Sequence, residues 1–378
     1  MTRFIVVAVA FASVVAAARA AQDVTFLSLP PGYVAGKVSL GAGNHADALA
    51  PDPDDDNFIY VAGMFGAKAR IVRLDLRNGQ RTILFDCPTT GPTPVTIAGF
   101  AVLNATTIFI SDNYPHDRLY ILRDNNPRDG DFNDPGECRE LIRPILTNPG
   151  GDWTGSAVLA LRSGSTRLHL PPNTVLFQSE DGGTTQAEVL AVTNPTTSPA
   201  FQPPNAAYFS GFNYGGGLAL DSKGRLLVAS SFWPNSGKVW VCEDLNQNGV
   251  IGPGEWNILF ARASETTHSA GLTALVVDSA DRGYVSIGWA DAAHSDIQTF
   301  RIPLDPLHQK ASLATFATLN SPYVSAAIFN GPTRSFDPFA LSGATMVLLA
   351  LDPFYGNVNY LLTVRPSGPT GVGRWRSY

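Results

Sequence analysis

Short apolar or alternating segments recur along the chain, separated by Gly, Pro, Asn and Asp. The recurring unit is a strand of small apolar residues, a turn, a β-rich strand, a loop and a second β-rich strand. The strand after the turn is expected at 57–63, 106–112, 173–179, 224–230, 282–288 and 344–350, with starts about 49 to 67 residues apart. The pattern therefore predicts six copies of one β-rich unit.

Four short strands in each of six units are typical of a six-bladed β-propeller with four-stranded antiparallel blades. A pair of β-sandwiches is the alternative. The sixth unit lacks a clear fourth strand, and the segment 23–29 (DVTFLSL) is a spare strand near the N-terminus. We expect this N-terminal strand to join the sixth blade and close the ring, which would remove an open sheet edge.

Composition supports an all-β chain and excludes several classes of protein. The 378 residues are only 15% charged and include 35 Gly and 28 Pro, which disfavours long solvated helices and coiled coils. The net charge is −6 and no basic run occurs, so we expect no nucleic-acid partner. The 3 cysteines are too few for a disulfide framework, and at least one thiol is unpaired within the chain.

The first 20 residues have the pattern of a cleaved signal peptide. Arg3 is followed by an apolar stretch that ends in an Ala-x-Ala cleavage signal at Ala18–Ala20. A membrane anchor is the alternative, but the stretch is short, and no later run could span a bilayer. We expect a propeller over 21–366, a disordered tail over 367–378, a secreted or periplasmic location, and no membrane insertion.

The segment 244–255 (DLNQNGVIGPGE) fits the spacing of a 12-residue calcium loop, D-x-[DN]-x-[DN]-G-x5-E. Calcium prefers six to eight hard oxygen ligands, which alternate side chains and a closing Glu can supply. The candidate ligands are Asp244, Asn246, Asn248 and Glu255. Apolar strand-like segments flank the loop, so we expect it to lie in a β-hairpin rather than between helices. A turn that binds nothing is the alternative.

A related acidic loop spans 124–137 (DNNPRDGDFNDPGE) and shares the Pro-Gly-Glu ending. It is two residues longer, so spacing alone does not fix which oxygens coordinate. The candidate ligands are Asp124, Asn126, Asp129, Asp131 and Glu137. Both loops are expected to join the third and fourth strands of their blades. We therefore predict two structural Ca2+ sites far from the mouth of the channel, with a solvated acidic loop as the alternative for 124–137.

The opposite face collects aromatic residues from the blade-to-blade connections and the second-to-third loops. Exposed aromatic rings suit a ligand with apolar faces and hydroxyls, such as a glycan. The candidate ligand-binding residues are Trp153, Tyr214, Trp233, Trp289 and Tyr355. The leading hypothesis is a propeller that binds a glycan or another small extracellular molecule at this mouth. Packing between blades is the alternative role for any one of these rings.

The unit at 216–230 (GGLALDSKGRLLVAS) resembles the blades of SMP-30/gluconolactonase-like and NHL-like six-bladed propellers. The resemblance covers most of the chain at the level of pattern. It implies a catalytic divalent ion at the channel mouth, held by side chains near the starts of the innermost strands. The comparable positions here are Asp47, Asp152, Asn213 and His268. A metal-dependent hydrolase or lactonase is therefore the alternative function.

Overall fold

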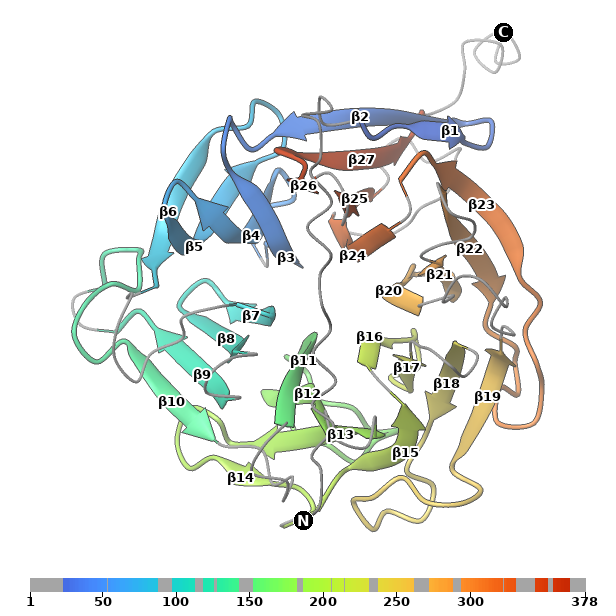
Figure 1. The fold of residues 1–378 in the computed structure, drawn as a ribbon. Helices are drawn as coiled ribbons and strands as arrows, with labels where there is room; N and C mark the ends of the chain where they lie inside the picture. The colour runs from blue at the N-terminus through green and yellow to red at the C-terminus, as the bar shows by residue number, and fades with distance from the viewer. Residues whose placement is uncertain are drawn as a thin grey trace, which may run out of the picture.

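The computed structural model describes residues 23–52, 54–87, 97–112, 118–125, 128–142, 152–181, 186–204, 206–213, 215–230, 237–261, 272–287, 294–321, 323–330, 344–352 and 356–367. All regular secondary structure in this part of the chain is β, in six antiparallel sheets. No helix among these residues could cross a membrane. The sheets stand around a central channel as the blades of a propeller (Figure 1).

Blades 1 to 3 each begin at the channel and continue outward, strand by strand. Blade 1 contains β3 (His45–Pro51), β4 (Phe58–Phe65), β5 (Lys68–Asp75) and β6 (Arg81–Asp86). Blade 2 contains β7 (Gly99–Asn104), β8 (Thr107–Asp112), β9 (Arg118–Arg123) and β10 (Cys138–Ile142). Blade 3 contains β11 (Asp152–Leu161), β12 (Thr174–Asp181) and β13 (Gln186–Thr193), with β14 (Ala200–Phe201) and β15 (Phe209–Asn213) both paired to β13.

Blades 4 to 6 follow the same order, and blades 5 and 6 each gain a strand from the N-terminal segment. Blade 4 contains β16 (Gly215–Leu220), β17 (Leu226–Ser230), β18 (Lys238–Cys242) and β19 (Trp256–Ala261). Blade 5 contains β20 (Leu272–Val277), β21 (Arg282–Ile287), β22 (Ser295–Arg301), β23 (Ala314–Leu319) and β1 (Phe26–Ser28). Blade 6 contains β24 (Tyr323–Asn330), β25 (Thr345–Asp352), β26 (Gly356–Asn357), β27 (Tyr360–Pro366) and β2 (Tyr33–Ser39).

The six-bladed architecture confirms the fold predicted from the repeat, but the prediction about the closing strand was wrong. The segment 23–29 supplies β1, which pairs with β23 at the outer edge of blade 5. The strand that completes blade 6 is β2, which pairs with β27 from Tyr33↔Pro366 to Ser39↔Tyr360. The chain therefore crosses two outer edges, first that of blade 5 and then that of blade 6, before it enters blade 1.

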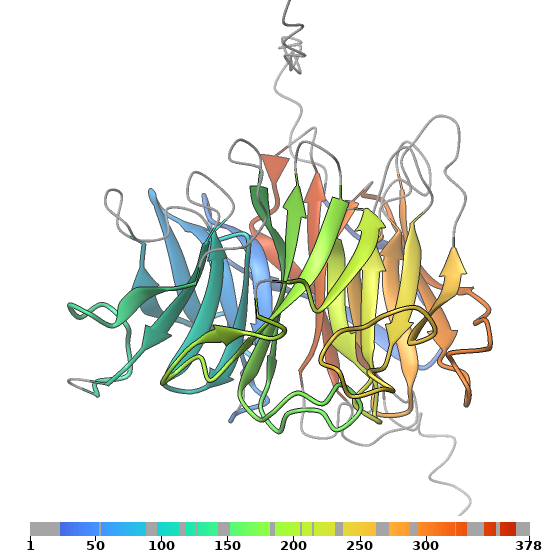
Figure 2. The ribbon, with the colours of Figure 1, turned by 90° about the horizontal axis from the view of Figure 1, so that it is seen from below.

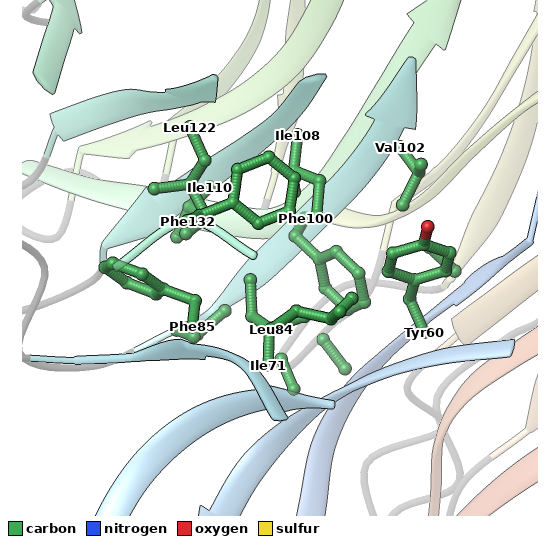
Figure 3. Packing of buried hydrophobic residues seen from close by; sticks show 14 of the residues in the cluster. Tyr60, Ile71, Leu84, Phe85, Phe100, Val102, Ile108, Ile110, Leu122 and Phe132 are labelled. Atoms are coloured by element: carbon green, nitrogen blue, oxygen red, sulfur yellow. The ribbon is translucent and has the colours of Figure 1, made fainter. Parts of the chain in front are cut away.

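The described core residues form six hydrophobic clusters, one between each pair of neighbouring blades. Alternate residues of each strand face opposite neighbours, so every blade contributes to two clusters. Figure 3 shows the cluster between blades 1 and 2, where Phe85 and Phe100 lie beside Phe132. Phe132 comes from the loop between β9 and β10 rather than from a strand. Seen edge-on, the strands run along the channel axis (Figure 2).

Candidate metal loops and channel mouth

Both acidic loops join the third and fourth strands of a blade, as the sequence predicts. The loop 124–137 connects β9 to β10 in blade 2, and the loop 244–255 connects β18 to β19 in blade 4. In an antiparallel blade this junction lies on the face that also carries the first-to-second turns. The second-to-third loops and the blade-to-blade connections lie on the opposite face, which we call the mouth face.

In the loop 244–255, two buried carboxylates organise the backbone. Asp244 accepts hydrogen bonds from the backbone N–H groups of Asn248 (3.2 Å) and Gly249 (3.0 Å). Glu255 accepts hydrogen bonds from the N–H groups of Asn246 (2.9 Å) and Gly252 (2.8 Å). Gly249 has φ of 78°, a left-handed conformation that a glycine adopts without strain. The loop is thereby folded around its first and last acidic residues.

The loop 124–137 repeats this arrangement despite its extra length. Asp124 Oδ2 accepts a hydrogen bond from the N–H of Gly130 (3.2 Å), which has φ of 93°. Glu137 accepts hydrogen bonds from the N–H groups of Asn125 (3.0 Å) and Asp134 (3.2 Å). Asp124 and Glu137 are both buried, as Asp244 and Glu255 are. In both loops, therefore, the first and last carboxylates accept hydrogen bonds from the loop backbone and fix its conformation.

The loops differ in how completely their buried oxygens are satisfied. In 244–255, all four carboxylate oxygens of Asp244 and Glu255 accept a backbone hydrogen bond. In 124–137, Asp124 Oδ1 and Asp134 Oδ2 are buried and have no hydrogen-bond partner, and Asp124 is only 5% exposed. A buried carboxylate oxygen without a partner is destabilising unless a cation or a donor compensates it. The open oxygens of Asp124 and Asp134 would therefore be compensated by a bound cation or by a further donor.

The remaining predicted ligands have other partners within the described residues. Asp129 and Asp131 accept hydrogen bonds from the N–H groups of Asp131 (3.3 Å) and Asn133 (2.9 Å), respectively. The side-chain oxygen of Asn246 accepts a hydrogen bond from the N–H of Asn248 (3.0 Å), and that of Asn248 accepts one from the N–H of Val250 (2.9 Å). Asn126 lies outside the described residues. In the part of the chain that the structure describes, no three His, Cys, Asp or Glu side chains form a group that could hold a metal ion.

Each acidic loop also reaches across to the outer part of the preceding blade. The N–H of Phe132 donates to the carbonyl oxygen of Leu84 on β6, at 2.8 Å. The N–H of Ile251 donates to the carbonyl oxygen of Tyr208, next to β15, also at 2.8 Å. The side chains of Phe132 and Ile251 are buried in the adjoining interblade clusters. We call this combination of a backbone hydrogen bond and an apolar plug a latch.

A third latch joins blades 4 and 5 without an acidic loop, and its apolar plug consists of Leu307 and Leu313, which pack against the cluster between these blades. The N–H of Ala311, between β22 and β23, donates to the carbonyl oxygen of Leu259 on β19 at 2.8 Å. The side-chain amide of Asn257 then donates to the carbonyl oxygens of Pro306 (2.7 Å) and Gln309 (2.9 Å). The carboxylates of the first two latches are therefore not required for latching as such.

The channel holds a cavity of about 430 Å³ lined by the innermost strands. Most lining side chains are small or aliphatic, such as Ala50, Ala101 and Val158, and Gly216 and Gly217 also line the cavity. Asp47, Phe100 and Arg162 contribute a carboxylate, a ring and a guanidinium to the wall. The innermost strands also turn an unpaired edge toward the channel, because each has a partner on one side only. Backbone N–H and C=O groups along such an edge need water or a ligand as partners.

Asp47 is the predicted catalytic residue whose environment is best defined. The β3–β4 register shifts between Ala46 and Ala48, so Asp47 is the extra residue of a β-bulge at the mouth end of β3. Bulges re-aim side chains and are common beside active sites. Asp47 lines the cavity, and its Oδ1 lies 3.6 Å from Nε2 of His45. Partial desolvation raises the pKa of this carboxyl, whose side chain is still 42% exposed, and the charge of His45 lowers it.

The described residues place the four predicted catalytic positions only in part, so their grouping into one site stays a prediction. Asp152 begins β11, the innermost strand of blade 3, and pairs with Asp181. Asn213 ends β15 and pairs with Gln186 on the outer side of the same blade, so β12 and β13 separate it from β11. Their side chains, and all of His268, lie outside the described residues.

The predicted aromatic residues of the mouth stay a prediction. Trp153 lies in β11 with its backbone opposite Glu180, and its side chain is outside the described residues. The others are wholly outside them: Tyr214, Trp233, Trp289 and Tyr355.

Two buried polar residues near the mouth were missed by the sequence reasoning. Gln178 and Ser179, near the end of β12, are both fully buried, and the Nε2 and Oε1 atoms of Gln178 and the Oγ of Ser179 have no hydrogen-bond partner. The available signal was a Gln-Ser pair that interrupts the apolar run Val175–Phe177. A buried amide without a partner costs about 1–3 kcal/mol, so these atoms need an explanation.

Comparison with known proteins supports the fold. No protein-family model matches the chain, and no curated protein sequence matches it. Solved structures do match. The PQQ-bound form of an aldose sugar dehydrogenase from Streptomyces coelicolor has a TM-score of 0.56 at 14% identity, covering 89% of this chain and 99% of that one. A luciferin-regenerating enzyme has a TM-score of 0.55 at 11% identity, covering 89% and 96%.

A gluconolactonase from Xanthomonas campestris has a TM-score of 0.51 at 10% identity, covering 90% of this chain and 93% of that one. At these identities the likeness defines the fold alone. The protein is a six-bladed β-propeller, the fold that it shares with these solved structures.

Proposed function

We propose that this protein is an exported, calcium-stabilised propeller that binds a glycan or another small extracellular molecule at the mouth of its channel. The observation that carries the calcium assignment is the buried Oδ1 of Asp124, which has no partner in a loop that also buries Glu137. Two buried carboxylates and an unsatisfied oxygen favour a hard cation, and oxygen donors of this kind select calcium.

The residues that would hold calcium are those that the spacing predicts. In blade 2 they are Asp124, Asn126, Asp129, Asp131 and Glu137, and in blade 4 they are Asp244, Asn246, Asn248 and Glu255. The ion would neutralise acidic repulsion and keep each latch in one conformation. Extracellular modules with such loops bind calcium with Kd on the order of 10⁻⁴–10⁻³ M.

Calcium binding is tested by metal analysis and thermal unfolding before and after dialysis against a chelator. We expect about two ions per chain, and a lower Tm without calcium. Glu137→Gln and Glu255→Gln should each lose one ion and most of the calcium-dependent rise in Tm. Asn257→Ala is the matched control, because it weakens the latch that contains no predicted calcium loop and should lower Tm equally with and without calcium. Unchanged ion counts in both Gln variants would overturn the assignment.

Ligand binding at the mouth is supported by the cavity that opens beside Asp47 and by the backbone edges of the innermost strands. The test is a thermal-shift and calorimetric screen with D-glucose, N-acetyl-D-glucosamine, cellotriose and chitotriose. Replacing Trp153 or Trp289 by Ala should weaken binding without lowering the Tm of the ligand-free protein. A wild-type protein that none of these sugars shifts would contradict glycan binding.

A metal-dependent hydrolase or lactonase is the second candidate, and the position of Asp47 favours it. A carboxylate on a bulge of an innermost strand, 3.6 Å from a histidine, is placed to contact a ligand in the channel. The test is hydrolysis of glucono-lactone with and without added divalent ions, in the wild type and in Asp47→Asn. Equal rates for both proteins would remove Asp47 from any such reaction.

A further inference from the structure

The unpartnered amide of Gln178 lies close to the channel wall. The β11–β12 register pairs Thr154 with Ser179 and Val158 with Phe177, and residues 155–157 between them form an irregular segment. Gln178 is opposite this segment. Ala157 and Val158, at the end of the irregular segment, line the cavity. One strand therefore separates Gln178 from the channel, at the point where that strand is least regular.

Strand alternation fixes the direction of the side chain. Leu176 packs between blades 3 and 4, and Phe177 packs between blades 2 and 3. The β12–β13 ladder continues past them without a register shift, so Gln178 faces blade 4, as Leu176 does. On that side the innermost strand β16 begins with three glycines, Gly215–Gly217, and two of these line the cavity. This part of β16 carries no side chain that could satisfy the amide.

Serines near the mouth end of the second strand in blades 2 and 5 are satisfied within the protein. In blade 2, Ser111 Oγ donates to the carbonyl oxygen of Gly99 (3.1 Å). In blade 5, Ser286 Oγ donates to the carbonyl oxygen of Val324 (3.0 Å) and accepts from the N–H of Ala274 (3.1 Å). Blade 3 is different, because Gln178 and Ser179 occupy this level of the second strand with three unpartnered side-chain atoms.

Gln178 is fully buried in the ligand-free fold and does not line the cavity. From this contrast we infer that it is a recognition residue for a hydroxyl-bearing ligand that binds in the channel at blades 3 and 4 and opens the gap between β11 and the glycines of β16. A carboxamide offers two donors and an acceptor together, which match a pair of neighbouring hydroxyls such as a sugar presents. Ser179 faces the other way and is not part of this contact. The inference rests on the proposed function, since it names a residue and a ligand chemistry for the same mouth.

The ligand-free protein provides the first test, because a recognition group and a structural group respond oppositely to substitution. Gln178→Leu removes a buried amide that has no partner, so Tm should stay the same or rise. Gln298→Leu is the matched control. Gln298 is also buried, but its amide donates to Thr315 Oγ1 (2.9 Å) and Asp296 Oδ2 (3.3 Å). This control should lower Tm by about 2–4 °C.

Sugar binding provides the second test. Whichever probe among D-glucose, N-acetyl-D-glucosamine, cellotriose and chitotriose shifts the wild type should bind Gln178→Leu about tenfold or more weakly, and should bind Gln298→Leu unchanged. A loss of Tm in Gln178→Leu as large as in Gln298→Leu would mean that an ordered water or a protein group satisfies the amide, and would overturn the inference. Unchanged sugar binding by Gln178→Leu would overturn it as well. If no probe shifts the wild type, glycan binding itself fails, while the Tm comparison still decides whether Gln178 is structural.

Discussion

The backbone N–H of Phe132 lies 2.8 Å from the carbonyl oxygen of Leu84, and this hydrogen bond joins the acidic loop of blade 2 to the outermost strand of blade 1. The Phe132 side chain fills the same interface, where it packs in the cluster that contains Phe85 and Phe100 (Figure 3). The loop is thus both a candidate cation site and part of the hydrophobic core.

Phe132→Ala should therefore destabilise the fold with calcium present or absent. Truncating a fully buried Phe costs about 3–5 kcal/mol, and chemical denaturation monitored by circular dichroism would measure the change. Ile251→Ala, at the matching position of blade 4, should cost about 2–5 kcal/mol. A loss below about 1 kcal/mol in the Phe132 variant would show that the latch does not contribute to the core.

The buried pair Asp221–Arg225, in the turn between β16 and β17, should be sensitive to removal of one partner. Arg225 Nε donates to Asp221 Oδ2 at 2.5 Å, and the two side chains are 5% and 0% exposed. Asp221→Ala leaves a buried guanidinium unpaired, with an expected loss of about 3–5 kcal/mol. The same turn in blade 5 pairs Asp278 with Arg282, which is 27% exposed. Asp278→Ala should therefore cost less, and equal losses in urea titrations would contradict this account.

Stability should fall at acidic pH in part through Asp86. The hydrogen bond that Arg70 donates to Asp86 lowers the pKa of this carboxyl, and the hydrogen bond from Lys68 lowers it by a smaller amount. A carboxyl whose pKa is lower in the folded state stabilises the fold above its unfolded pKa of about 3.9, and this contribution is lost as the pH falls through the folded value. Asp86→Asn should flatten the dependence of Tm on pH below about pH 5. An unchanged slope would count against the contribution of Asp86.

Truncation of the N-terminal segment should separate the roles of β1 and β2. A chain that begins at residue 40 lacks both strands, which exposes the edge of β27 in blade 6. Open edges pair with other chains, so this variant should aggregate or lose its cooperative melt. A chain that begins at residue 31 lacks only β1, and it should keep the oligomeric state of the full chain with a lower Tm. Size-exclusion chromatography and thermal melts distinguish the two, and identical behaviour would contradict a closing role for β2.

The strands that the sequence predicted are those whose apolar pattern matches their burial. The expected segment 106–112 corresponds to β8, in which all six residues are buried. The closing strand β2 was missed because its sequence, YVAGKVS, contains Gly and Lys and is mostly exposed. Its extended conformation comes from pairing with β27, a tertiary contact that periodicity does not carry. The apolar segment 23–29 was assigned to blade 6 instead, although it supplies a strand of blade 5.

The candidate metal loops could be located from spacing alone, because carboxylates at set intervals around a glycine are a local feature. The sequence could not show that an oxygen of Asp124 lacks a partner, because its burial and its partners depend on how blade 2 packs against blade 1. The same holds for Gln178, whose significance lies in the missing partner rather than in the residue type. The loop motifs could be identified from the sequence. Buried atoms that lack a hydrogen-bond partner could be identified only in the folded structure.

The three latches are unevenly distributed around the ring. They tie blades 1 to 2, 3 to 4 and 4 to 5, and the N-terminal segment runs across the outer edges of blades 5 and 6. Within the described residues, two side-chain hydrogen bonds cross between blades 2 and 3, from Arg123 to the carbonyl oxygen of Thr196 (3.2 Å) and from Arg162 to that of Val102 (3.4 Å). We therefore expect the ring to open preferentially at the interface between blades 2 and 3. Amide hydrogens beside the junction of blades 2 and 3 should exchange first, while blades 3 to 5 open later as one unit.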